Sequence, residues 1–279
     1  MVERLRQGPG PEARPAAAAP AGPPPSRWTL RAIRATVARW DGLTLSGVWH
    51  ALRRLGLALR SAAVQQHSPD PAYLDKEARL LAVLRAAAAA PDEVVVLFLD
   101  EMGYTRWPVP AADWGPAAPA PRPVAARAGS KQQLWRVIGA LNAVTGQVDY
   151  AENYIIGRER VSAFYRHLDQ RYAHARRIYV IQDNWSIHAH PDVLATVTAL
   201  PRLEPVWLPT YAPWLNPIEK LWRWLKGDVL KQHRLAADWP ALRRRVRAFL
   251  DQFAAGSPAL LRYVGLLGDG TLAQACHPA

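Results

Sequence analysis

Three acidic residues, each placed at the end of a well-marked element, constrain this chain more than any other feature. Asp100 follows the apolar run 94–99, and Asp183 follows a second apolar run, 178–182. Short runs of β-branched and apolar residues bounded by turn signals predict buried strands. Glu219 lies where a proline-rich segment turns into a predicted helix. Carboxylates at the carboxyl ends of such strands project into a shared crevice, so we expect these side chains to meet.

A shared site of three carboxylates predicts metal chemistry. The carboxylates repel one another unless a cation lies between them, and hard oxygen ligands suit Mg²⁺ or Mn²⁺. A site for phosphoryl transfer with two ions of Mg²⁺ (or Mn²⁺) explains all three acids. We therefore predict that Asp100, Asp183 and Glu219 are both the catalytic residues and the metal ligands.

Each acid also has a purely structural explanation. Asp100 is followed by Glu101, and the two can form a solvated strand end. Asp183 and its neighbour Asn184 can form a simple turn, because both residue types bond their own backbone. Glu219 falls at the third helical position after a possible N-cap, as in a capping box. The three acids together, in this order and context, favour the catalytic interpretation.

The segments that carry the acids read Leu-Asp-Glu at 99–101, Gln-Asp-Asn-Trp-Ser-Ile-His at 182–188 and Leu-Pro-Thr-Tyr-Ala-Pro-Trp-Leu-Asn-Pro-Ile-Glu at 208–219. They resemble the three blocks of the mariner superfamily of DDE transposases, in its bacterial insertion-sequence branch. The resemblance runs from about Trp28 to about Phe253, and the third block is its most specific part. It implies a ribonuclease H-like catalytic core that cuts transposon ends and joins them to target DNA.

The resemblance also implies a mechanism and partners. Asp100 and Asp183 would share metal ions, and Glu219 would hold the second ion. One ion activates a water or a DNA 3′-hydroxyl, and the other stabilises the leaving oxygen. The partners would be double-stranded DNA, namely transposon inverted repeats and a target, with TA as the favoured target dinucleotide. We expect a homodimer on DNA.

Three polar residues near the acids are predicted helpers. Asn184 can orient Asp183 or contact phosphate, and Asn216 can cap the helix of Glu219 and so direct its carboxylate. His188 is either a helper or a capping or surface histidine.

The segment 27–64 reads as a helix-turn-helix. Helices are predicted over 29–40 and 47–55, the second capped by Ser46 and ended by Gly56. Its second helix can enter the major groove. Any two-helix hairpin gives this pattern, but the resemblance supports DNA binding because the family carries helical DNA-binding modules before its core. The outward residues of the second helix are Trp49, His50, Arg53 and Arg54.

Charge points to the same class of partner. The net charge of +12 predicts a polyanionic ligand, although arginine-rich usage is also typical of GC-rich genomes. Residues 1–60 and 220–247 each carry +7, whereas 61–219 carries −1. The predicted DNA contacts in the second basic segment are Lys220, Arg223 and Lys226. In the same helix we expect Trp222 in the core and consider Trp224 for base stacking.

The predicted fold class is α/β: a ribonuclease H-like mixed sheet with flanking helices, preceded by a small helical DNA-binding segment. The elements of the core follow the order β-β-β-α-β-α-β-α. The predicted domains are a disordered Pro/Ala-rich tail 1–26, the helix-turn-helix 27–64, a linker and helix 65–92, the catalytic domain 93–255 and a C-terminal tail 256–279.

Several classes are excluded or left as alternatives. The single cysteine, Cys276, excludes a disulfide framework and a cysteine zinc site. Without a long apolar stretch or signal peptide, we expect a cytoplasmic, nucleoid-associated protein. The alternatives are a ribonuclease H-like nuclease without strand joining, a non-catalytic DNA-binding remnant, and a truncated transposase copy. Truncation is considered because the family usually carries two helical subdomains, and only one helix pair is predicted here.

Overall fold

The computed structural model describes residues 27–60, 68–113, 123–128, 131–268, 270 and 272–273. The predicted disordered tail 1–26 and Cys276 lie outside these residues. The chain divides into two compact units, with the boundary between Gln65 and Gln66. Within the described ranges, no helix is long and apolar enough to cross a membrane.

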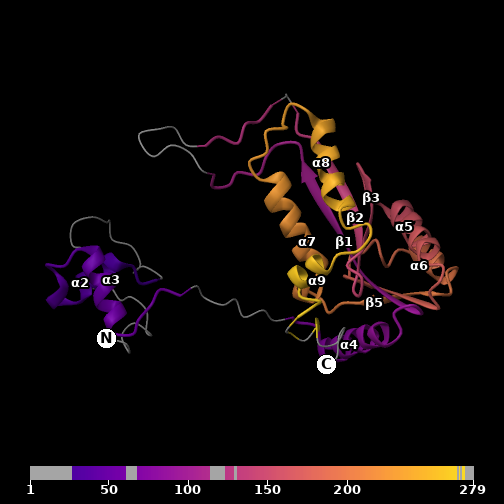
Figure 1. The fold of residues 1–279 in the computed structure, drawn as a ribbon, viewed down its shortest axis with the longest axis horizontal. Coiled ribbons are helices and arrows are strands. Elements are labelled where there is room, and N and C mark those ends of the chain that lie inside the picture. Colours follow the sequence, from indigo (N-terminus) through magenta and orange to yellow (C-terminus); the bar gives the residue numbers. More distant parts are fainter. Residues whose placement is uncertain are drawn as a thin grey trace. The chain divides into compact units, whose positions relative to one another are not determined.

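The first unit contains the helix pair predicted for a helix-turn-helix (Figure 1). Its elements are α2 (Leu30–Thr36), the 3₁₀ helix η2 (Ala38–Trp40) and α3 (Leu45–Arg54). The first helix is shorter than predicted because Val37 is extended, with φ −110°. The Thr44 hydroxyl, and not Ser46, caps α3 by accepting a bond from the Gly47 N–H at 3.1 Å. Gly56 has φ +74°, as expected for a left-handed C-cap.

The second unit is built on a five-stranded mixed sheet, in the order β3-β2-β1-β4-β5. Strand β2 is antiparallel to β1 and β3, whereas β4 pairs in parallel with β1 and β5. The strands are β1 (Val94–Thr105), β2 (Leu134–Asn142), β3 (Val148–Asn153), β4 (Arg177–Gln182) and β5 (Leu203–Trp207). The helices between and after them are α5 (Arg158–Arg171), α6 (Pro191–Thr198) and α7 (Ile218–Leu225). This is the predicted order of elements.

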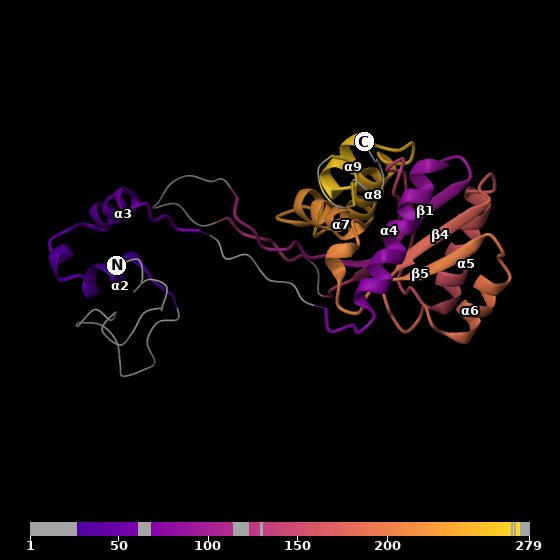
Figure 2. The ribbon, with the colours of Figure 1, turned by 90° about the horizontal axis from the view of Figure 1, so that it is seen from below.

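Helices cover both faces of the sheet (Figures 1 and 2). Alternate residues of β1 serve the two faces, because successive side chains of a strand point to opposite sides. Val96 and Phe98 face one core, and Leu97 and Leu99 face the core under α5 and α6. The first core is covered by α7, by the π-helical turn η4 (Lys226–Leu230), and by α4 (Tyr73–Ala89), α8 (Trp239–Asp251) and α9 (Pro258–Val264).

Two features of the second unit differ from the sequence predictions. Strand β1 does not end at Leu99 but continues to Thr105, because β2 pairs with it as far as Thr105 while its pairing with β4 stops at Phe98. The segment 256–279, expected as a tail, contributes α9. Leu260 and Leu261 of α9 are buried in the core, so the folded unit extends beyond residue 255.

Candidate active site

The register of the sheet brings the first two acids together. Phe98 of β1 lies opposite Ile181 of the parallel strand β4. Two residues further on, the same register places Asp100 level with Asp183, which directly follows β4. Residues two apart in a strand share a face, and neighbouring strands lie roughly 4.8 Å apart. Asp100 therefore lies on the face covered by α7, at the point where the partner strand β4 has ended.

The third acid, Glu219, lies in the first turn of α7. The predicted capping of this helix by Asn216 is wrong, because Pro217 occupies the N-cap position and no side chain caps the helix. Asn216 is buried, and its amide Nδ2 instead donates to the Leu99 carbonyl at 3.1 Å. This bond ties the start of α7 to β1 directly before Asp100.

All three acids line one cavity of about 410 Å³. Its other walls come from Asn184, Trp185 and Asn216 and from the loop 208–213. Burial, together with the negative charges of Glu219, Glu101 and Asp183, raises the pKa of Asp100 to about 8. The cavity therefore holds excess negative charge that a bound cation would relieve.

Trp222 contacts the site in a way that the sequence did not predict. Its indole Nε1 donates to Asp100 Oδ2 at 2.9 Å, and the side chain is 1% exposed, as expected of a core residue. The ring lies against Gly139 of β2, the residue that pairs with Asp100. Two signals point to such a bond: Trp222 is one helical turn after Glu219, and a buried indole N–H needs an acceptor.

His188 lies on the other side of the acids, and its predicted alternative as a surface residue is wrong. The side chain is buried, with Nδ1 at 3.2 Å from the Tyr165 hydroxyl. Its Nε2 lies 3.5 Å from Glu101 Oε1 and 3.8 Å from Asp183 Oδ1. Burial raises the pKa of Tyr165 above its usual range, so the hydroxyl stays protonated and donates to Gln182. His188 is therefore held beside Asp183 from the α5 side.

Asn184 does not bond Asp183 in the structure. Its Nδ2 donates to the Leu208 carbonyl at 2.9 Å and so joins the end of β4 to the loop after β5. Asp183 Oδ1 instead accepts a bond from the Trp185 N–H at 3.0 Å. Phosphate contact by Asn184 remains a prediction.

The basic residues predicted on α7 divide into two groups. Arg223 and Lys226 are exposed. Lys220 is partly buried, and its Nζ donates to the Val264 carbonyl at 2.7 Å, which ties α7 to the end of α9.

Trp224, considered for base stacking, packs against an aromatic cluster, and its Nε1 donates to Asp228 at 2.7 Å. Its ring is therefore in contact with other side chains of the protein. The other members of that cluster are Phe249, Phe253 and Tyr263.

The DNA-contact residues predicted in the first unit are exposed on α3. Trp49 is 44% exposed, and the Arg53 guanidinium lies 5.5 Å from its ring centroid. The His50 ring packs edge-on against the same indole, and Arg54 is also exposed. A helix with basic and aromatic side chains facing solvent is compatible with DNA binding, which stays a prediction.

Comparison with known proteins identifies the family. Residues 95–243, which include all three acids, match the family model of the DDE superfamily endonucleases. The chain belongs to this family. It is 27% identical over 232 residues to the insertion element IS630 uncharacterized 39 kDa protein of Shigella sonnei. That match covers 81% of this chain but only 64% of the relative, so the chain spans less than two thirds of the relative's length.

Solved structures of the Mos1 mariner transposase have the same fold. The paired-end complex with the left transposon end has a TM-score of 0.58 at 14% identity, covering 94% of this chain and 80% of that one. The complex with Mn has a TM-score of 0.56 at 15% identity, covering 89% and 78%. The strand transfer complex has a TM-score of 0.56 at 16% identity, covering 89% and 77%. The predicted ribonuclease H-like fold and the predicted membership of the DDE superfamily are confirmed.

Proposed function

We propose that this protein is a DNA transposase that cuts transposon ends and joins them to target DNA at Asp100, Asp183 and Glu219. One observation carries the proposal: the three acids, each from a different part of the chain, line a single cavity. Family membership supports the assignment, since residues 95–243 match DDE endonucleases. The alternative, a nuclease that hydrolyses DNA without strand joining, would use the same acids.

The residues of the cavity fit divalent ions, and we propose that two ions bind there. The raised pKa of Asp100 reflects burial and uncompensated negative charge, which cations would offset. Asn216 also lines the cavity, and its Oδ1 is buried without a partner among the described residues. In the described part of the chain, no three His, Cys, Asp or Glu side chains are grouped to hold one ion. Mg²⁺ commonly binds only one or two carboxylates and takes its other ligands from water and phosphate.

Each part of the site has a distinct task in this proposal. Bound to the three acids, the ions would activate the attacking oxygen and stabilise the leaving oxygen. Trp222 orients the Asp100 carboxylate through its 2.9 Å bond, and Asn216 holds the start of α7 against β1. The same acids can serve hydrolysis and strand joining, because both are in-line displacements at phosphorus that differ only in the attacking oxygen.

Double-stranded DNA is the proposed substrate, and the exposed Arg223 and Lys226 are proposed phosphate contacts. We further propose that α2 and α3 bind the transposon ends, and that the DNA-bound form is a homodimer, as the paired-end Mos1 complexes suggest. A TA target would suit the site, because TA steps deform easily.

The DNA that flanks the gene tests the transposase assignment directly. Short inverted repeats bounded by a duplicated TA are expected, and a gene without such repeats would contradict a transposase.

Purified protein tests the chemistry. With Mg²⁺ or Mn²⁺ and an oligonucleotide duplex carrying the flanking repeat, wild-type protein should produce both cleaved ends and joined products. Asp100→Ala and Asp183→Ala should abolish both products while leaving DNA binding intact. Asp192→Ala is the matched control, since Asp192 is an exposed acid on α6 that does not line the cavity. Cleavage that survives Asp100→Ala would place the site elsewhere, and cleavage without joining would favour the nuclease.

A further inference from the structure

Tyr211 combines an unfavourable backbone with an exposed ring. Its φ is +55°, a left-handed conformation that a residue with a β-carbon rarely adopts. The side chain is 77% exposed and lines the cavity that contains the three acids. Its hydroxyl has no hydrogen-bond partner among the described residues. Unusual backbone conformations persist where the surrounding structure holds them, and they are concentrated at functional sites.

The residue before Tyr211 is held by a segment far away in the sequence. The Ser68 hydroxyl donates to the Thr210 carbonyl at 2.5 Å. Asp70 Oδ2 accepts from the Thr210 N–H at 2.8 Å. Both backbone polar groups of Thr210 are therefore bonded by residues 68–70, which we name the clasp. Asp70 is in turn fixed by an ion pair with Lys76 at 2.8 Å, and its side chain is only 6% exposed.

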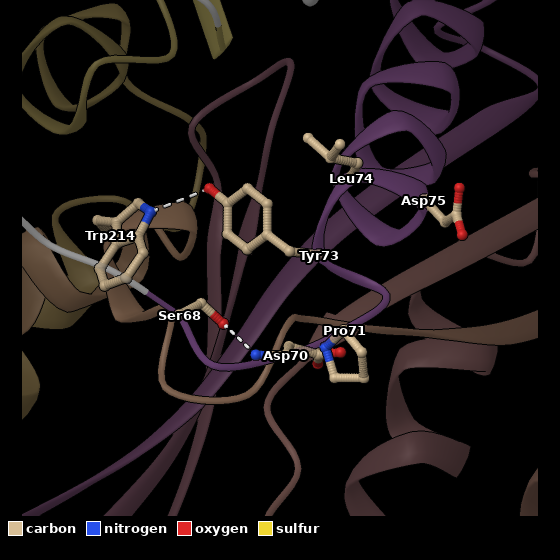
Figure 3. Close-up of a pocket in the computed structure, with 7 residues that line it drawn as sticks. All are labelled: Ser68, Asp70, Pro71, Tyr73, Leu74, Asp75 and Trp214. Atoms are coloured by element: carbon tan, nitrogen blue, oxygen red, sulfur yellow. Dashed lines mark hydrogen bonds between the residues drawn. The ribbon is translucent and has the colours of Figure 1, made fainter.

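The rest of the loop is anchored on both sides of Tyr211. Before it, the Leu208 carbonyl accepts from Asn184. After it, Trp214 Nε1 donates to the Tyr73 hydroxyl at 3.3 Å, beside the clasp (Figure 3). The loop is held by its backbone at Leu208 and Thr210 and by the Trp214 side chain, while the ring of Tyr211 stays exposed. This arrangement presents an aromatic ring at the mouth of the acidic cavity, where a DNA strand would enter.

We propose that Tyr211 is a DNA-contacting residue whose ring stacks on a nucleobase next to the scissile phosphate, and that Ser68 and Asp70 are positioning residues that present it. The inference rests on the proposed function, because it needs DNA at the acids. Stacking on an aromatic ring suits a catalytic site, since it tolerates any base. The ring of Trp224, by contrast, is packed against Phe249.

Binding of a fluorescent DNA tests the contact. The probe is a duplex with a short single-stranded 3′ overhang that contains 2-aminopurine, added to the full-length protein without divalent ions so that no strand is cut. Raised salt reduces the phosphate contribution to affinity. Tyr211→Ala should weaken binding roughly 5- to 20-fold and abolish the quenching of 2-aminopurine, whereas Tyr211→Phe should keep both within about twofold. The control is Tyr154→Ala, because Tyr154 is 60% exposed but does not line the cavity.

Two results would overturn the contact. Wild-type affinity and quenching in Tyr211→Ala would show that the ring touches no base. Equal losses in Tyr211→Phe and Tyr211→Ala would show that the hydroxyl, and not the ring, makes the contact.

A double-mutant cycle tests the clasp. Asp70→Asn places an amide N–H₂ against the Thr210 N–H or the Lys76 ammonium, so the loop should loosen and the quenching should fall. If Asp70 acts through Tyr211, the double variant should bind no more weakly than Tyr211→Ala alone. Losses that simply add would overturn the positioning role. Asp75→Asn is the control and should leave the quenching unchanged, because Asp75 is an exposed acid near the clasp that does not bond Thr210.

Failure of this inference differs from failure of the proposed function. If Tyr211→Ala binds the probe normally while Asp100→Ala abolishes cleavage, the contact is wrong and the transposase stands. If Asp100→Ala still cleaves, the acidic site itself is wrong, and the proposed contact beside it is overturned as well.

Discussion

Adding one methyl group at Gly139 should disable the site without touching an acid. A β-carbon there would lie 2.6 Å from Cη2 and 2.9 Å from Cζ2 of Trp222. The indole must therefore shift, and the 2.9 Å bond from its Nε1 to Asp100 Oδ2 must lengthen or break. This shift is costly, because Trp222 is 1% exposed and its neighbour Ile218 is fully buried.

The magnitude follows from the two interactions that Gly139→Ala disturbs. Overpacking a tight core typically costs about 1–3 kcal/mol of unfolding free energy. A loss of about 2 kcal/mol in a unit of this size should lower Tm by roughly 4–8 °C. Loss of the bond that orients a metal-binding carboxylate typically lowers metal affinity or activity by about 10- to 100-fold. Thermal unfolding and strand cleavage, measured on the same preparation, check both values.

Two companion variants separate packing from the hydrogen bond. Trp222→Phe removes the Nε1 donor but keeps an aromatic ring, so cleavage should fall by about 10- to 100-fold, with the larger part of any stability loss coming from the smaller ring. Gly157→Ala is the glycine control, because a β-carbon there meets no atom within 4 Å. The reasoning would be refuted if Gly139→Ala kept wild-type Tm and activity, or if Trp222→Phe cleaved DNA normally.

Three further predictions concern charge and the end of the chain. In metal-free protein the folded pKa of Asp100, about 8, lies above its ordinary value. The contribution of protonated Asp100 to the free energy of unfolding is therefore present at low pH and is lost as pH rises from about 4 through 8. Thermal unfolding in a chelator should show this loss in wild type but not in Asp100→Asn; parallel curves would contradict it. Arg223→Gln and Lys226→Gln should each lower the salt slope of DNA binding by about 1, whereas Lys220→Gln, whose Nζ bonds Val264, should lower Tm instead. Leu260→Ala should lower the free energy of unfolding by about 2–5 kcal/mol in denaturant unfolding, since Leu260 is fully buried. A loss under about 0.5 kcal/mol would instead support the prediction that 256–279 is a tail.

The sequence predicted the elements of the core because their signals are local. The run before Asp100 is buried on both faces of β1, which is why it reads as continuous apolar residues rather than an alternating pattern. The end of β1 could not be predicted in this way. The six residues after Leu99 continue the strand because β2 pairs with them, and their partners lie 29 or more residues further along the chain. Asp100 is consequently inside a strand, next to the end of β4.

The site was predicted less completely, since its bonds join distant segments. His188 is buried because Tyr165 of α5 reaches it, and Lys220 points to α9 because Val264 offers a carbonyl. Asn216 has every local feature of an N-cap, yet the Leu99 carbonyl takes its amide. Such partners are fixed by packing of elements far apart in the sequence, which local patterns do not contain.

The three acids are not held equally firmly, and this difference leads to a last prediction. Asp100 and Glu219 are set relative to each other by two bonds between β1 and α7, from Trp222 to Asp100 and from Asn216 to Leu99. Asp183 follows β4, whose pairing with β1 stops at Phe98, and its side chain is 55% exposed. Binding of divalent ions should therefore move Asp183 more than Glu219. Crystal structures with and without Mn²⁺ would measure the two displacements against β1, and a Glu219 that moved further than Asp183 would mean that the β1–α7 bonds do not fix the site.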